Sequence, residues 1–240
     1  MKGEAMSVNK EAYKQLIADL GSHHTTLVAV SKTKSVEEIK ELYHLGQKDF
    51  GENYVQELTE KQAQLPQDIH WHFIGHLQSN KVKQIASFVH LVQSVDSVKL
   101  LQEINKQAKK NERVIDCLLQ VHIAQEETKF GLDETELNEL LNNSISQYQN
   151  IHVVGLMGMA SFTDDTEKVR SEFKYLKSIF DKHAKLLQRN PSGQTSPRES
   201  FRTNVKFHTL SMGMSSDYFI AIEEGSNMVR IGSLIFGARN

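Results

Sequence analysis

Short apolar runs alternate with amphipathic stretches along most of the 240-residue chain. Runs of this length are typical of buried strands, and the stretches between them have the periodicity of helices. The predicted strands cover residues 26–32, 48–53, 70–75, 90–95, 114–123, 151–160, 205–212 and 228–237. Eight strands that alternate with helices favour a parallel sheet.

Helix signals occupy the intervals between these strands. The opening helix carries four apolar residues on one face, namely Tyr13, Leu16, Ile17 and Leu20. In residues 35–46, Ser35 and Glu38 form a capping box at the start and Gly46 supplies the stop. Longer helices are predicted for residues 97–110, 133–145 and 165–188. Residues 190–204 are polar and contain two of the three prolines, which predicts a surface loop.

The number of strand–helix units predicts the fold class. Eight such units in a chain of this length indicate an α/β fold, a (β/α)8 TIM barrel formed by residues 1–240 as a single domain. An open doubly wound sheet is the alternative that the pattern alone leaves open. A closed barrel has no open sheet edge, so we expect a monomer.

Composition excludes several classes of function. The 28 Lys and Arg residues nearly balance the 30 Asp and Glu residues, so the charge gives no sign of a nucleic-acid or membrane partner. Cys117 is the only cysteine and lies in an apolar run, which excludes an intramolecular disulfide and favours a buried, unreactive thiol. The N-terminus has no apolar core typical of a signal peptide, and no run approaches a membrane span. We therefore expect a soluble cytoplasmic protein.

Two small-residue turns follow the last two strands, where a barrel carries its functional groups. The first is 211-SMGMSS-216, and the second is Gly232 with Ser233. Glycine lets the backbone approach a ligand, serine donates hydrogen bonds, and a helix N-terminus offers free N–H groups. Either turn alone is more typical of an ordinary connection. At these matching positions, the two together predict a phosphate site.

Lys32 and Arg230 make this phosphate site more specific. A lysine at a strand end inside a barrel loses its proton readily and can form a Schiff base with an aldehyde. An arginine within an apolar strand needs a partner, which is either a bound ligand or a buried carboxylate such as Glu52. Aldehyde, phosphate and an aromatic ring nitrogen occur together in pyridoxal 5′-phosphate (PLP). A solvated strand-end lysine is the alternative for Lys32.

Seven motifs then carry a resemblance to a known family. They are 29-AVSKTK-34, 50-FGENYVQE-57, 71-WHFIGHLQSNK-81, 129-KFG-131, 155-GLMGM-159, 210-LSMGMSSD-217 and 227-NMVRIGSLIFGAR-239. The sequence resembles the pyridoxal phosphate homeostasis proteins, whose fold is like the barrel domain of alanine racemase. The motifs run from about residue 26 to the C-terminus, so the resemblance covers most of the chain. Its departures are few: a long 190–204 loop, and His76 where several members carry proline.

The resemblance implies a role for individual residues around PLP. Lys32 would bind the cofactor as an internal aldimine, with Asn53 close by, and Arg230 would face the pyridine nitrogen. Ser211, Gly232 and Ser233 would hold the phosphate, and Gly213 would shape the first turn. His72, Ile74 and Met157 would line the pocket. Lys34 shares the face of Lys32 but lies two residues further out.

The same resemblance bears on whether the protein is an enzyme. It implies a carrier that holds PLP without evident turnover, serves intracellular vitamin B6 homeostasis and delivers PLP to apo-enzymes. The alternatives are a PLP-dependent amino-acid racemase or decarboxylase and a cofactor-free aldolase. A racemase needs a second base, which relatives of this fold take from a further domain, and the chain ends at Asn240 right after the last strand. Lys81 and Lys129 would form a second PLP site or a docking surface, or simply be solvated.

Overall fold

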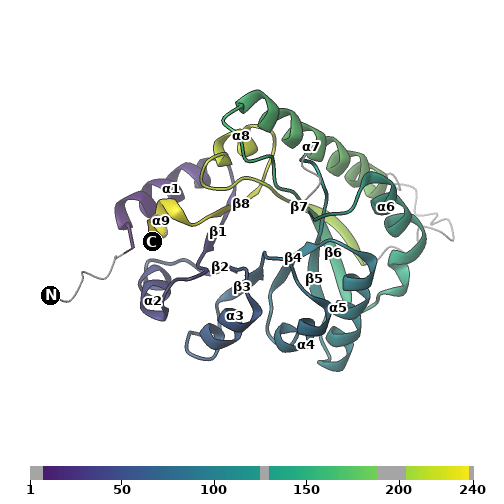
Figure 1. The fold of residues 1–240 in the computed structure, drawn as a ribbon, viewed down its shortest axis with the longest axis horizontal. Helices are drawn as coiled ribbons and strands as arrows, with labels where there is room; N and C mark the ends of the chain where they lie inside the picture. The colour runs from purple at the N-terminus through teal and green to yellow at the C-terminus, as the bar shows by residue number, and fades with distance from the viewer. Residues whose placement is uncertain (1–7, 125–129, 189–203, 238–240) are drawn as a thin grey trace.

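Eight parallel strands pair in chain order and close on themselves in the computed structural model of the protein (Figure 1). The structure describes residues 8–124, 130–188 and 204–237. The strands are β1 (Thr26–Val30), β2 (Asp49–Glu52), β3 (His70–Phe73), β4 (Leu91–Val95), β5 (Ile115–Gln120), β6 (Ile151–Met157), β7 (Val205–Ser211) and β8 (Met228–Ile231). Because β1 pairs with both β2 and β8, the barrel prediction is confirmed and the open sheet is wrong.

Helices follow the strands and surround the barrel (Figure 1). In the described part of the chain they are α1 (Lys10–Ser22), α2 (Val36–His44), α3 (Val55–Gln62), α4 (Val82–Ile85), α5 (Val98–Lys110), α6 (Glu134–Glu139), α7 (Thr166–Gln188), α8 (Tyr218–Glu223) and α9 (Ser233–Phe236). A 3-10 turn (Ser79–Lys81) precedes α4, and a π-helical turn (Leu140–Ser144) with a 3-10 turn (Ile145–Gln147) continues α6. Among the described residues, no helix combines the length and apolar character that crossing a membrane requires.

The capping signals of α2 behave as the sequence predicts. Ser35 and Glu38 form the capping box of α2, and Gly46 adopts a φ of +102° just after it. Ile17, however, is 40% exposed on α1, so the buried face of that helix is narrower than predicted. The predicted strand of residues 228–237 ends at Ile231, and the remaining apolar residues form α9. The predicted 190–204 loop falls almost wholly outside the described residues.

The barrel wall separates a large outer core from a small inner one. Outward-facing strand residues pack against the helices, whereas an inner cluster fills the barrel with Val28, Leu91, Leu118, Val154, Met157 and Met228. Buried polar side chains, among them Arg230, Ser211 and Gln93, also point into the barrel. The alternation of inward-facing and outward-facing residues along each strand therefore determines which side chains reach the interior of the barrel.

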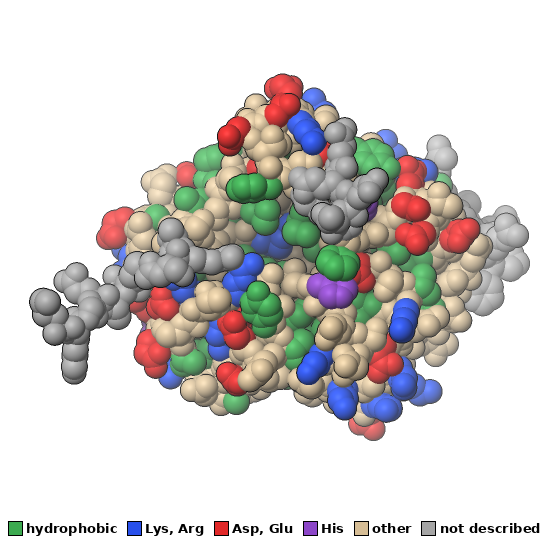
Figure 2. Space-filling model, viewed as in Figure 1, with side chains coloured by type: hydrophobic (Ala, Val, Ile, Leu, Met, Phe, Trp, Pro, Cys, Tyr) green, Lys and Arg blue, Asp and Glu red, His purple; other side chains and the backbone are tan. Residues whose placement is uncertain are grey.

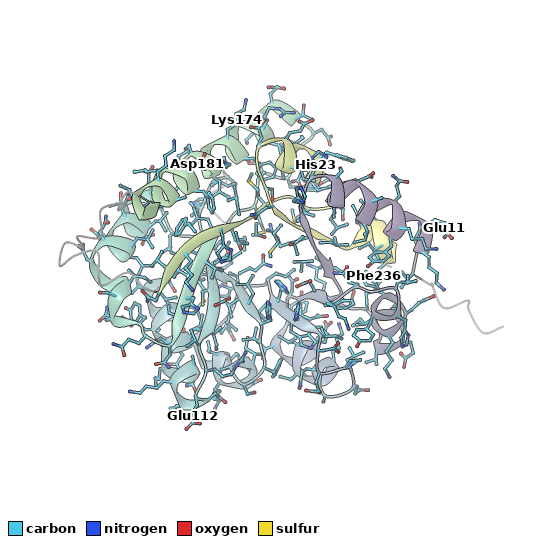
Figure 3. The ribbon with its side chains drawn as sticks, turned by 180° about the vertical axis from the view of Figure 1, so that it is seen from behind. Glu11, His23, Glu112, Lys174, Asp181 and Phe236 are labelled. Carbon is cyan, nitrogen blue, oxygen red and sulfur yellow. The ribbon has the colours of Figure 1, made fainter. Side chains whose placement is uncertain are left out.

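The two ends of the described chain meet beside the barrel. In Figure 3, Phe236 on α9 lies next to α1, which carries Glu11. The Asn9 N–H donates to the Ile235 carbonyl at 2.8 Å, and Asn9 also caps α1. This contact holds α9 in place directly behind the turn of Gly232 and Ser233.

Candidate functional site

A cavity of about 200 Å³ lies at the carboxyl ends of the strands, where β1, β2, β3, β6, β7 and β8 lead into their loops. Figure 2, viewed along the same direction as Figure 1, shows hydrophobic side chains gathered around the centre of that face, with Lys or Arg side chains between them. The cavity is lined by Val30, Lys32, Lys34, Asn53, Ile74, Met159, Met214, Ser215, Arg230, Gly232, Ser233, Phe236 and Gly237. Cationic side chains and small residues thus share one concave wall.

A tight turn presents Lys32 at the end of β1. Lys32 follows Val28 and Val30 on the inward face of the strand, so its half-buried side chain lines the cavity. The Lys34 N–H donates to the Ser31 carbonyl at 3.0 Å and closes the turn. Thr33, within it, has a φ of +64°, which is strained for a β-branched residue. The backbone around Lys32 is therefore held in an unusual conformation.

A buried ion-pair network holds this turn from behind. Lys61, only 6% exposed, donates from Nζ to the Ser31 carbonyl and Glu52 Oε1 at 2.8 Å and to Glu57 Oε2 at 2.9 Å. Ser31 Oγ donates to the same Glu52 oxygen at 2.6 Å, and the Thr33 N–H donates to Glu57 at 2.7 Å. These bonds join the turn to β2 and to α3. The network fixes the position from which Lys32 projects.

Burial acts differently on the two carboxylates of this network. Burial raises the pKa of Glu52, against the opposing effect of Lys61. Burial also opposes ionisation of Glu57, but the bonds from Lys61 and from the Thr33 N–H outweigh it and lower the pKa. The sequence left open a salt bridge between Arg230 and Glu52, and this pairing is wrong. Glu52 faces out of the barrel to Lys61, whereas Arg230 faces in.

Arg230 is anchored inside the barrel beneath the cavity. Its Nη1 donates to Ser211 Oγ at 2.6 Å and its Nη2 to the Gly158 carbonyl at 3.0 Å, and the residue is 4% exposed. Burial lowers the pKa of the guanidinium to about 10, with the charge of Asp217 opposing the shift. The group is cationic at neutral pH. Two of its five N–H donors are used in these bonds, which orient the guanidinium while it lines the cavity floor.

A chain of hydrogen bonds continues from Arg230 through the barrel. Ser211 Oγ donates to Gln93 Oε1 at 2.7 Å, and Gln93 Nε2 lies 2.9 Å from His72 Nδ1. His72 Nε2 lies 3.0 Å from Asp49 Oδ1 at the opposite end of the strands. Burial opposes ionisation of Asp49, but His72 and then His70 outweigh it and lower the pKa of the carboxyl group. We call this series, Arg230–Ser211–Gln93–His72–Asp49, the polar column.

The two turns predicted as a phosphate site lie side by side at the cavity. Gly213 has a φ of +96°, and a Cβ there would lie 2.6 Å from the Ala221 Cβ. The Arg230 N–H donates to the Gly213 carbonyl at 3.0 Å, which ties the turn to β8. A Cβ on Gly232 would lie 3.0 Å from the Val30 carbonyl oxygen, so this backbone passes close to β1. The Gly232 N–H donates to Ser215 Oγ at 3.4 Å across the gap between the turns.

The structure brings six of the ten sequence-predicted residues together on the cavity wall: Lys32, Asn53, Ile74, Arg230, Gly232 and Ser233. The other four lie beneath or behind the wall. Ser211 and His72 belong to the polar column, Met157 to the inner apolar cluster, and Gly213 to the turn. These positions do not test the predicted contacts with a ligand, which stay predictions.

Sequence reasoning missed several lining residues. Ser215 lies on the cavity wall. Strand β7 continues through Ser211, and only after the turn at Gly213 does the 211–216 segment reach the cavity, at Ser215. The glycine within SMGMSS was the available signal. Lys34 lies closer than predicted and lines the same cavity. Its Nζ donates to the Phe236 carbonyl at 2.9 Å and lies 3.4 Å from Glu38.

A second, wider groove of about 740 Å³ adjoins the first at Asn53. Lys81 lies on it and is exposed, together with His76 and Tyr54. His76 stacks on the exposed Phe130 at a centroid distance of 4.2 Å. Lys129, the other lysine singled out in the sequence, lies outside the described residues. Cys117, as predicted, is fully buried, and burial raises the pKa of its thiol.

Comparison with known proteins relates this geometry to a family. The family model described as alanine racemase, N-terminal domain, matches residues 5–240. A pyridoxal phosphate homeostasis protein of Aquifex aeolicus is 41% identical over 223 residues, which cover 92% of this chain and 90% of the relative. The human protein of the same name is 37% identical over 252 residues, covering 99% and 86% of the two chains.

Solved structures show the same fold. PipY of Synechococcus elongatus with PLP bound is 32% identical and superposes with a TM-score of 0.80, covering 95% of this chain and 99% of its own. Alanine racemase of Bartonella henselae with covalently bound pyridoxal phosphate superposes with a TM-score of 0.65, over 95% of this chain and 59% of its own. Its 16% identity limits that likeness to the fold.

Proposed function

Because this chain belongs to the alanine racemase N-terminal domain family and, within it, to the pyridoxal phosphate homeostasis proteins, we propose that it binds PLP at the barrel mouth and holds it without turnover of a substrate. The observation that carries the proposal is the meeting of Lys32, Arg230, Gly232 and Ser233 on one cavity. These residues come from the two ends of the chain, and only closure of the barrel brings them together.

The wall fits the cofactor in two further respects. Asn53 Oδ1 is buried and has no hydrogen-bond partner among the described residues, so it offers an acceptor to a ligand. The close passage of Gly232 along β1 leaves space that a Cβ would reduce. A cationic guanidinium, an amine and a small-residue cradle suit a compact ligand that has an aldehyde and a phosphate.

Each lining residue then has a defined task. Lys32 would hold the cofactor through Nζ, because an amine condenses with an aldehyde and releases one water. Ser233 and the Gly232 backbone would hold the phosphate, and Ser215, whose Oγ accepts from the Gly232 N–H, would add its hydroxyl to the same group. Arg230 would face the ring nitrogen and disfavour its protonation, because like charges repel. Ile74 and Met159 would pack against the ring.

Retention without turnover is supported by the groups on the wall. Racemisation needs proton transfer on both faces of a substrate, hence two positioned bases. Among the described lining residues, the titratable groups are Lys32, Lys34 and Arg230. Lys34 is held by the Phe236 carbonyl and Glu38, and Arg230 is anchored below. PLP, when bound, supplies an electron sink, and Arg230 weakens it by opposing ring protonation.

The proposal includes delivery of the cofactor. Condensation with an amine is reversible, and Ser233 at the rim of the cavity is exposed. Bound PLP can thus be released and transferred to apo-enzymes that need it. A monomeric state and a cytoplasmic location stay predictions from the sequence.

Absorbance spectroscopy on purified protein tests covalent retention. We expect addition of PLP to give a band near the visible that persists after gel filtration, and borohydride reduction to fix the cofactor mass on the peptide with Lys32. Lys32→Ala should abolish both signals. Lys34→Ala is the matched control, because Lys34 lines the same cavity, and it should retain them. Wild-type protein that PLP cannot colour, or equal labelling of Lys32→Ala, would contradict the proposal.

A second assay separates a carrier from a racemase. PLP-loaded protein incubated with L- or D-alanine in deuterated water should leave the α-hydrogen and the configuration unchanged. Purified alanine racemase serves as the positive control. Steady formation of the opposite enantiomer would establish the racemase.

A further inference from the structure

Three histidines and an aspartate meet at the amino ends of β2, β3 and β4, at the opposite end of the strands from the PLP cavity. Asp49 is the first residue of β2 and His70 the first of β3, and the two are paired in register. His90 precedes β4 directly, and its N–H donates to the Trp71 carbonyl at 2.9 Å. His72 lies two residues beyond His70 on the same strand face. We call this group the amino-terminal rim.

Three of these side chains are arranged as a ligand set. One donor atom each of Asp49, His70 and His90 lies within 4.8 Å of the other two. The rings of His70 and His90 stack at a centroid distance of 4.4 Å, and His70 Nδ1 lies 3.2 Å from Asp49 Oδ1. A tetrahedral ion with bonds of about 2.0–2.1 Å has donors roughly 3.3 Å apart. Both imidazoles are exposed, and they would rotate out of their stacked arrangement to bring their donor atoms to that spacing.

The carboxylate of this set is already oriented. Gln93 Nε2 is an amide donor, so His72 Nδ1 accepts and its Nε2 carries the proton that is donated to Asp49 Oδ1. His72 is 1% exposed and cannot itself reach solvent. Metal-binding sites commonly hold their ligands through such outer partners. Asp49 and His70 are also the first residues of neighbouring strands, which position side chains more rigidly than loops do.

From this geometry we propose that Asp49, His70 and His90 bind a divalent transition-metal ion of the zinc type at the amino-terminal rim. Two imidazoles and one carboxylate suit Zn²⁺, with water completing the shell, better than they suit Mg²⁺ or Ca²⁺, which prefer oxygen ligands. The ion would connect β2, β3 and β4 at the end of the barrel that contributes stability and not catalysis. The site is separate from Lys32 and does not depend on PLP.

A second histidine–aspartate pair on the chain supplies a matched control. His152 on β6 lies 3.1 Å from Asp116 on β5 and is partly exposed, also at the amino ends of its strands. In the part of the chain that the structure describes, the three-ligand arrangement is found at Asp49, His70 and His90 and does not include this pair. If exposed histidines bound zinc non-specifically, His152 would contribute to zinc affinity as much as His70 and His90 do.

Isothermal titration of EDTA-treated, tag-free protein with ZnCl₂ tests the site. We expect one ion per chain in the tightest class, at least a tenfold loss of affinity in His70→Ala and in His90→Ala, and no change in His152→Ala. Bound Co²⁺ should give visible absorption that the same two variants lose, and circular dichroism checks that they fold. Wild-type affinity in His70→Ala and His90→Ala, or an equal loss in His152→Ala, would overturn the proposal. Both PLP-loaded and PLP-free protein should give the same result, so failure here leaves the PLP proposal standing.

Discussion

Replacing Lys61 by methionine tests whether the buried network behind the Lys32 turn maintains both the fold and the site. Methionine nearly matches lysine in length but lacks the ammonium group that contacts Ser31, Glu52 and Glu57 at 2.8–2.9 Å. Glu52 is fully buried and would lose the cation that it contacts. The side chain of Glu57 is 29% exposed and would regain water, so most of the cost falls on Glu52.

The expected loss follows from removing one partner of a buried pair. Such a change costs about 3–5 kcal/mol, because a desolvated charge remains. Against a total stability of about 5–15 kcal/mol, this loss removes a large share of the free energy of unfolding. In a chain of this size the melting temperature falls by about 2–4 °C per kcal/mol, so a decrease of roughly 6–20 °C is expected.

The loss depends on pH with a defined sign. Burial already raises the pKa of Glu52 in the native protein, and removing Lys61 raises it further. A carboxyl group with a raised folded-state pKa binds more protons when folded, so stability is lost as pH rises through that pKa. The deficit of Lys61→Met should therefore be larger at about pH 8 than at about pH 5. Adding Glu52→Gln should recover part of it at the higher pH.

Urea denaturation at both pH values measures the effect through the midpoint and the slope. Lys40→Met, at an exposed position on α2, is the control and should change stability by no more than about 0.5 kcal/mol. The proposed covalent PLP attachment at Lys32 should also slow in Lys61→Met, because the Ser31 carbonyl keeps the Lys34 N–H but loses the Lys61 ammonium as a donor. Equal midpoints for the two methionine variants at the higher pH would refute the reasoning.

Two further substitutions and one chemical modification test single features. Gly213→Ala should destabilise the protein by about 1–3 kcal/mol, because Gly213 has a φ of +96° and the new Cβ would clash with the Cβ of Ala221. An unchanged melting temperature would contradict this. Thr33→Gly removes left-handed strain of about 1–2 kcal/mol but adds unfolded-state entropy of about 0.5–1 kcal/mol. Urea denaturation should therefore show a free energy of unfolding that is higher by about 0.5 kcal/mol. A lower free energy of unfolding would show that the Thr33 side chain stabilises the turn. Cys117 is fully buried, and burial raises the pKa of its thiol. A disulfide exchange reagent should therefore modify it only at the rate at which the protein unfolds. Fast modification of the native protein would disprove its burial.

The strands and the order of elements could be predicted from the sequence because they depend on local periodicity. Closure could only be inferred from the count of eight units, since it depends on β1 pairing with β8 across the whole chain. The last apolar run shows a limit of periodicity. Its second half forms α9 because Gly232 ends the strand, and an apolar run alone does not distinguish a strand from a buried helix.

The sequence predicts which strands contribute to the site, but it does not predict which of their side chains reach the cavity. Strand alternation places Lys32 and Arg230 inward, as expected, and the same rule places Glu52 outward, away from Arg230. The sequence favours Ser211 over Ser215 because it does not reveal where β7 ends relative to the cavity. Lys61 could not be found, since two of its three partners, Ser31 and Glu52, lie outside its own helix.

The polar column gives the barrel a direction. Arg230 can only donate and the Asp49 carboxylate can only accept, so every hydrogen bond between them points the same way and the series cannot be reversed. His72 is thereby restricted to one tautomer, which the nitrogen chemical shifts of its ring would report. Bonds arranged in series polarise one another. A change of charge at Asp49 should therefore alter the strength of the hydrogen bonds that reach Arg230 at the other end of the barrel.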